Sequence, residues 1–157
     1  MNTQQILDAI QADANLHQWR FERNDGAIAE ALSVGRTKPV SKIITARGIA
    51  ASYPGGAINA EVVLMKLEGA AATMLASADP NQKVLGSLLT RQLAFLKSEG
   101  LDFGDATLRG MLDSFAAMSI ITAQEAANLK AMALAPDPVS VNDVSAALNT
   151  ISTVAGV

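Results

Sequence analysis

Signals that begin a helix recur along this chain. Aspartate, serine or threonine stands just ahead of several apolar runs, where its side-chain oxygen can accept a hydrogen bond from a free amide of the first helical turn. At two of these points an acidic residue follows three positions later, which is the capping-box pattern. The helix-starting residues are Asp25, Asp79 (before Pro80), Asp105, Thr122 (with Glu125) and Ser140 (with Asp143). We therefore expect many helices joined by short connections.

The spacing of apolar residues predicts where these helices run. The clearest stripe consists of Leu108, Met111, Leu112 and Phe115. A further helix is predicted over residues 40–52, although Gly48 and the β-branched residues weaken this prediction and leave a short strand as the alternative. Residues 16–24 are expected to form a connector or a further helical turn, and residues 152–157 a frayed tail. The other predicted helices cover residues 3–15, 26–33, 57–78 and 80–98 and the runs that follow Asp105, Thr122 and Ser140.

These helices are expected to pack as one domain. The chain has 157 residues, of which 50% are hydrophobic and 17% charged, and this composition excludes a disordered protein. No strand is convincing and no repeat has a fixed period. The expected fold class is all-α, a single-domain bundle of about six to seven short-to-medium helices over residues 1–157. A soft division is expected at residues 53–56, Tyr-Pro-Gly-Gly, between an N-terminal helical part and a C-terminal bundle.

The predicted helix over residues 57–78 is apolar on almost every side. A membrane span is disfavoured because Glu61, Lys66 and Glu68 lie within it, and each charge costs about 2.5–3.5 kcal/mol at the bilayer centre. We therefore expect the central, most buried helix of the bundle and no membrane contact. Its small residues let another helix approach closely, which makes it the candidate oligomer helix. The residues assigned to that contact are Val62, Val63, Met65, Gly69 and Thr73.

The residues that carry most protein chemistry are scarce. The chain has no Cys, so thiolate metal sites and Cys nucleophiles are excluded. It has a single His, His17, which is the one residue that could serve as the base of a Ser-His-Asp triad. The segment Asp102–Asp105 lacks the alternating ligands of a calcium loop, and we assign it to helix capping. Gly55 and Gly56 are assigned to a turn rather than to a phosphate site. We expect no metal, no cofactor and no enzymatic activity.

A local basic cluster indicates one alternative function. Residues 25–37 fit the first helix and turn of a helix-turn-helix, and residues 40–44 would then begin its recognition helix. The basic residues are Arg36, Lys38, Lys42 and Arg47. The net charge of −3, Pro39 and the isoleucines after it argue against DNA binding. The other interpretation of this cluster is a helical packing unit with a basic rim for another protein.

Three stretches also carry a resemblance. They are residues 25–37, residues 120–131 (IITAQEAANLKA) and residues 136–148 (PDPVSVNDVSAAL). Each resembles a segment of small, Ala-rich proteins encoded among the late genes of tailed bacteriophages. The resemblance implies a phage origin and a role in the particle or its assembly, with no catalytic residue to carry over. The implied location is the host cytoplasm during assembly, or the virion.

Together these patterns predict a non-enzymatic helical phage protein that acts by protein–protein contact, as a virion component or an assembly factor. Its expected partners are other phage proteins or further copies of itself. Two alternatives stay open: a helix-turn-helix regulator that binds DNA, and a helical protein that holds a small ligand in the bundle core. The first five residues show neither a basic nor an apolar segment, so no signal peptide is expected.

Overall fold

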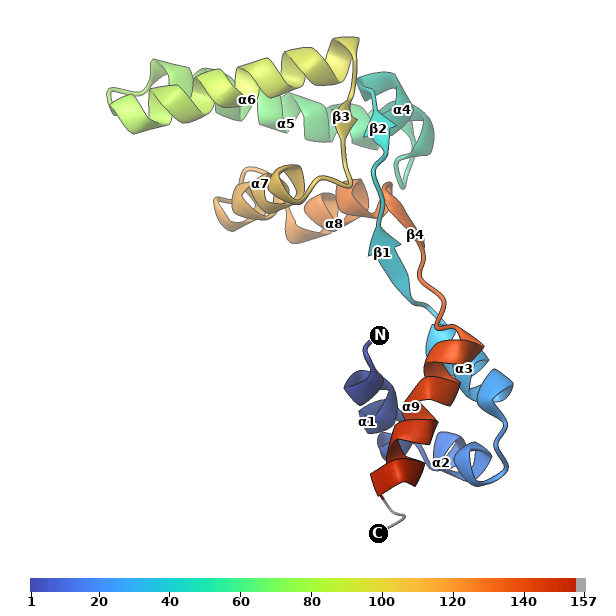
Figure 1. The fold of residues 1–157 in the computed structure, drawn as a ribbon. Helices are drawn as coiled ribbons and strands as arrows, with labels where there is room; N and C mark the ends of the chain where they lie inside the picture. The colour runs from blue at the N-terminus through green and yellow to red at the C-terminus, as the bar shows by residue number, and fades with distance from the viewer. Residues whose placement is uncertain (155–157) are drawn as a thin grey trace. The chain divides into compact units, whose positions relative to one another are not determined.

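The computed structural model describes residues 1–154, with side chains described through residue 150 (Figure 1). This part of the chain is mostly helical, as predicted, but it contains nine helices rather than six to seven, and short strands pair in two-stranded sheets. The contacts divide the chain into two compact units. One unit combines residues 1–38 with the chain from Ala135 onward, and the other spans Pro39–Leu134. The boundaries fall within two paired strands, β1 (Thr37–Pro39) and β4 (Leu134–Pro136).

The first unit is a small group of helices around its own core. Its helices are α1 (Thr3–Ala12), α2 (Ala14–Phe21), α3 (Asp25–Ser33) and α9 (Val141–Val154). The most deeply buried side chains of this core are Ile6, Ile10, Ile28 and Val144. Arg36 and Asp137 join the two chain segments of the unit. The Arg36 guanidinium donates to the Asp137 carboxylate at 2.7 Å, and the Asp137 amide donates to the Arg36 carbonyl at 3.1 Å.

The helix predicted over residues 3–15 is in fact two helices. Asp13 has an extended backbone, which ends α1. Its carboxylate then accepts hydrogen bonds from the amides of Asn15 and Leu16 and caps α2. α2 takes up most of the segment 16–24, so the helical alternative for that segment is confirmed.

The second unit has a larger core. Its elements are β2 (Ile43–Ile44), α4 (Ala46–Ser52), α5 (Ala57–Ala76), α6 (Pro80–Ser98), β3 (Leu101–Asp102), α7 (Ala106–Ala117) and α8 (Ala123–Ala131). α5 and α6 form a long hairpin, α7 and α8 form a shorter one, and both contribute to the same core (Figure 1). Gly86 of α6 lets the long hairpin close tightly, because a Cβ atom at this position would lie 2.8 Å from the Leu75 amide nitrogen.

The helix predicted over residues 40–52 begins only at Ala46, and the strand alternative is realised in the residues before it. Ile43 and Ile44 form β2 and pair antiparallel with β3. The Thr45 hydroxyl then accepts a hydrogen bond from the Gly48 amide at 3.2 Å and caps α4, so the helix begins only at Ala46. Residues 40–45 therefore precede the helix, at the point where the helix-turn-helix interpretation requires a recognition helix to begin.

The Tyr-Pro-Gly-Gly segment at residues 53–56 lies within the second unit and does not separate the two units. Tyr53 is 6% exposed and belongs to the core of that unit. Gly55 and Gly56 turn the chain into α5 with φ angles of +84° and +86°, values that favour glycine. The segment is thus a tight turn between two helices that pack on the same core.

Most of the predicted helix starts are confirmed. Thr122 and Glu125 form the expected capping box, with hydrogen bonds of 3.1 and 2.7 Å between side chain and amide. Ser140 accepts from an amide at the start of α9, and the predicted aspartates cap α6 and α7. At α3 the cap is Asn24 rather than Asp25, which is already the first helical residue. The prediction was one residue late because both side chains can serve as caps.

Two further expectations concern the end of the chain and the membrane. The frayed tail predicted for residues 152–157 lies mostly outside the described residues, in which α9 continues to Val154. Among the helices of the described part, none combines the length and apolar character needed to cross a bilayer.

Candidate interaction surface

One face of α5 is uncharged and points to solvent along the whole helix. Its residues recur at alternating spacings of four and three, which keeps them on one side of the helix. They are Ile58, Val62, Met65, Gly69, Ala72 and Ala76, called the α5 stripe below. All six are exposed, with Ile58 at 81% and Met65 at 61%. α5 is therefore buried on one face, whereas its apolar sequence predicts burial nearly all round.

The residues predicted for an oligomer contact divide between the two faces of α5. Val62, Met65 and Gly69 belong to the α5 stripe, and Thr73 is exposed beside it. Val63 is 1% exposed and packs in the core of the second unit, so it is not available to a partner. The sequence pattern could not separate the two faces because both are apolar.

Ion pairs within the chain compensate the charges that flank the middle of the stripe. Lys97 of α6 lies 2.6 Å from Glu68, and Lys66 lies 2.6 Å from Glu125 of α8. The hydrogen bond to Glu68 raises the pKa of Lys97, and the Lys66 ammonium lowers the pKa of the Glu125 carboxyl. Glu61 is exposed on the same flank as Glu68, nearer the start of α5. The stripe is thus bordered mainly by charges that are already paired.

α6 adds a second exposed apolar row to the same hairpin. Val84, Leu88 and Phe95 recur at helical spacing and are exposed, with Arg91 between the last two. Of the large hydrophobic side chains that the described residues expose, more than half lie on α5 and α6. The hairpin therefore concentrates the apolar surface that the chain presents to its surroundings.

The basic residues of the helix-turn-helix interpretation do not lie on one recognition helix. Arg36 and Lys38 belong to the first unit and contact the same carboxylate, that of Asp137, at 2.7 and 3.4 Å. The Arg36 guanidinium, assisted by Lys38, lowers the pKa of Asp137. In the second unit, Lys42 precedes β2 and Arg47 is exposed in the first turn of α4. Two of the four basic side chains, Arg36 and Lys38, therefore hold the two chain segments of the first unit together.

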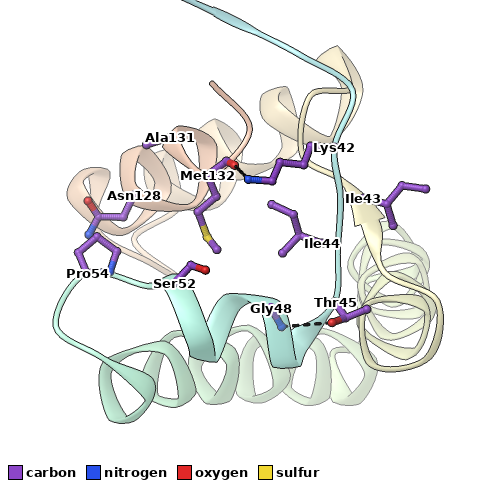
Figure 2. Close-up of a pocket in the computed structure, with 10 residues that line it drawn as sticks. All are labelled: Lys42, Ile43, Ile44, Thr45, Gly48, Ser52, Pro54, Asn128, Ala131 and Met132. Carbon is purple, nitrogen blue, oxygen red and sulfur yellow. Dashed lines mark hydrogen bonds between the residues drawn. The ribbon is translucent and has the colours of Figure 1, made fainter. Parts of the chain in front are cut away.

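An open groove of about 420 Å³ lies between β2, α4 and α8 (Figure 2). Several of its polar groups already serve the fold. The Lys42 ammonium donates to the Met132 carbonyl at 2.9 Å, and the Thr45 hydroxyl accepts from the Gly48 amide. The residues that line the groove include no His, Asp or Glu, so they supply no acid–base pair for catalysis.

The core of the second unit has little room for a ligand. A cavity of about 30 Å³ lies among side chains that include Leu64, Leu93 and Phe115. Sites that hold a small ligand are larger by an order of magnitude, at about 300–1,000 Å³. The geometry of this core therefore gives no support to the alternative of a small ligand held inside the bundle.

The two aspartates with a partial likeness to a calcium loop serve the fold instead. The Asp102 carboxylate accepts from the Ser41 hydroxyl at 2.6 Å, and also from the amides of Lys42 and Gly104. These hydrogen bonds, that from Ser41 first, lower the pKa of Asp102. Asp105 caps α7. Among the residues that the structure describes, no three His, Cys, Asp or Glu side chains gather as metal ligands do.

The tie between Asp102 and the segment before β2 was not predicted. A local signal was present, because an aspartate two residues before a glycine often bonds the backbone of its own turn. The longer-range partners could be found only once β2 was known to lie beside β3.

His17, the one imidazole, packs edge-on against Phe21 on the surface helix α2, with ring centroids 4.9 Å apart.

Comparisons with protein-family models, with curated proteins and with solved structures find no match for this chain.

Proposed function

We propose that this chain is a non-enzymatic helical protein that acts by protein–protein contact, as a virion component or an assembly factor of a tailed phage. The α5 stripe is the observation that carries the proposal. A helix of 20 residues with an apolar, exposed face gains free energy when another surface removes that face from water. The partners are other phage proteins or further copies of the chain. They meet in the host cytoplasm during assembly or within the virion.

The use of the polar side chains supports contact rather than catalysis. Catalytic sites bring together groups with shifted pKa values inside a cleft. Here the shifted pKa values belong to groups in surface ion pairs and loop hydrogen bonds, at Lys97, Asp102, Glu125 and Asp137. Each of these contacts joins segments of the fold.

The phage assignment rests on the three stretches that resemble late-gene proteins. In the folded chain they lie at α3, at α8 with the turn before it, and at the start of α9. Their shared features are helix caps and core positions. These are features that preserve a helical scaffold while its exposed faces adapt to a partner.

Mass spectrometry of purified particles and of assembly intermediates from infected cells tests the proposal. We expect the chain in one or both. Met65→Glu should lower the yield of complete particles, because it places a charge at the centre of the α5 stripe. Phe21→Glu is the matched control, since it puts the same charge on an exposed apolar side chain of the first unit. The proposal fails if the chain is absent from both particles and intermediates. A yield that Met65→Glu leaves unchanged removes the α5 stripe as the contact surface.

A further inference from the structure

We infer that the α5 stripe binds the same stripe of a second copy, with the two α5 helices antiparallel and a two-fold axis level with Leu67. The inference rests on the proposed function, because it names the partner that the stripe meets in a protein–protein contact. Alternating spacings of four and three amount to a repeat of 3.5 residues, which is the repeat of two helices that supercoil around each other. The stripe carries this repeat from one end of α5 to the other.

The order of side-chain sizes selects the antiparallel arrangement. The large residues of the stripe come first along the chain, and the small residues follow. An antiparallel pair centred level with Leu67 places Ile58 opposite Ala76, Val62 opposite Ala72, and Met65 opposite Gly69 of the second copy. Every large side chain then meets a small one, so the packing is even along the contact. A parallel pair would crowd the isoleucines at one end and leave the glycine and alanine layers without contact.

The centre of the stripe has room for the partner. A Cβ atom at Gly69 would meet nothing within 4 Å, so the space above this residue is open in the single copy. Met65 of the second copy fills that space in the antiparallel pair. Glycine and alanine at the contact also let the helix axes approach to the short end of the usual range of about 8–10 Å.

The charges beside the stripe are compatible with the two-fold symmetry. The axis brings Lys66 toward Lys66 of the second copy and Glu68 toward Glu68, an arrangement that repels when the side chains are unpaired. Each is already paired within its own chain, Lys66 with Glu125 and Glu68 with Lys97. Each copy carries a net charge of −3, so added salt screens the remaining repulsion and should strengthen the dimer.

The extent of the contact sets the expected affinity. From Ile58 to Ala76 the stripe is about 27 Å long and about one helix diameter, roughly 10 Å, in width. This footprint, about 270 Å² on each copy, lies below the usual range of specific interfaces and fits a weak, transient contact. We therefore expect a concentration-dependent dimer with a dissociation constant of about 0.1 mM.

Engineered cysteines report the geometry, because the chain has no Cys of its own. Chains with Val62→Cys and with Ala72→Cys, purified separately and mixed under mild oxidation, are expected to form a mixed disulfide. Val62→Cys by itself is expected to form almost none, since the two copies of position 62 lie about 15 Å apart along an antiparallel pair. The inference is overturned if Val62→Cys alone crosslinks as fast as the mixture, or if the mixture forms no disulfide.

A charged variant tests the surface without cysteines. At about 0.5 mM, above the expected dissociation constant, sedimentation equilibrium should find mostly dimer for the unmodified chain and a monomer for Met65→Glu. Phe21→Glu is the matched control, because Phe21 is 73% exposed on α2 of the first unit, is no part of the α5 stripe, and should leave the dimer intact. Circular dichroism checks that both variants keep their helices. An unmodified chain that stays monomeric, or a dimer that Phe21→Glu breaks and Met65→Glu leaves intact, overturns the inference.

The two proposals fail in distinguishable ways. A monomeric chain whose Met65→Glu variant still lowers the particle yield leaves the protein-contact function standing and removes the second copy as the partner. A dimeric chain that is absent from particles and intermediates leaves the self-association standing and removes the phage-assembly function.

Discussion

At the scale of single residues, Glu125 connects two helices and caps one of them. One carboxylate oxygen accepts from the Lys66 ammonium at 2.6 Å, and the other accepts from the Thr122 amide at 2.7 Å. Both contacts favour the ionised carboxylate, and Lys66 makes the larger contribution to lowering its pKa. The residue therefore ties the middle of α5 to the start of α8 as long as it keeps its charge.

We expect Glu125→Gln to lower the free energy of unfolding near neutral pH. The variant should also lose less of that free energy than the unmodified chain when the pH is lowered into the acid range. The pKa of Glu125 is lower in the folded chain than in the unfolded chain, where it is near 4.3. Its contribution is therefore complete above about pH 4.3 and is lost as the pH falls through the folded pKa. Denaturant unfolding at a series of pH values should show a difference of about 1 kcal/mol or less, since the ion pair is partly exposed. Exposed Glu61 gives the control variant, Glu61→Gln, and identical acid dependence in all three proteins would contradict the role of Glu125.

Gly86 is the residue on which the closeness of α5 and α6 depends. A Cβ atom there would lie 2.8 Å from the Leu75 amide nitrogen and 2.9 Å from the Met74 Cβ, so the α5 backbone must move. We expect Gly86→Ala to destabilise the chain by about 1–3 kcal/mol, despite the better helix propensity of alanine. Gly110→Ala in α7 meets nothing within 4 Å and should instead stabilise by about 0.5–1 kcal/mol. Thermal unfolding compares the two, and the same sign for both would contradict the packing argument.

At the scale of secondary-structure elements, the helix starts could be predicted from local sequence signals, whereas the pairing of strands far apart in the chain could not. The helix starts at Asp79, Asp105 and Thr122 follow from side chains that bond amides within three residues. The strand pairing of β2 with β3 joins segments that are far apart in sequence, and nothing near Ile43 encodes its partner. The break at Asp13 was missed because the apolar periodicity continues through it.

The same contrast applies to the candidate interaction surface. The sequence identified α5 and named Val62, Met65 and Gly69, since small and apolar residues mark a helix that others approach. It also named Val63, which is buried, because both faces of α5 are apolar and the direction of the core is a tertiary property. The exposed row on α6 was not predicted, because Val84, Leu88 and Phe95 fit a buried face equally well.

The break between α1 and α2 can be tested directly. Asp13→Ala removes the acceptor of the Asn15 amide, a hydrogen bond of 2.8 Å, and of the Leu16 amide. We expect a loss of about 1 kcal/mol in the free energy of unfolding, the usual cost of a lost cap. Asp8→Ala, within α1 and exposed, removes a carboxylate of the same kind and should change stability by no more than about 0.5 kcal/mol. Urea unfolding gives both values, and an equal loss in the two variants would show that Asp13 does not act as a cap.

At the scale of the whole molecule, the residues that the structure describes form two separate hydrophobic cores. The core of the first unit contains Ile6, Ile10 and Ile28 together with residues of α9, and it shares no residue with the core of the second unit. The first unit therefore draws on both sequence-distant segments of the chain, while the second is built from one continuous segment. Regions that are held by separate cores can open with separate free energies.

We expect a cavity in the first core to affect the first unit alone. Ile10 is 1% exposed, and Ile10→Ala should cost about 2–5 kcal/mol, a large share of the stability of a unit of about 60 residues. In hydrogen exchange followed by mass spectrometry, the amides of α1, α3 and α9 should lose protection while those of α5 and α6 keep it. Leu129→Ala, at an equally buried position of the second core, should produce the reverse pattern. If either substitution exposes the amides of both units to the same extent, the two cores unfold as one cooperative structure, because the loss of one would then remove the support of the other.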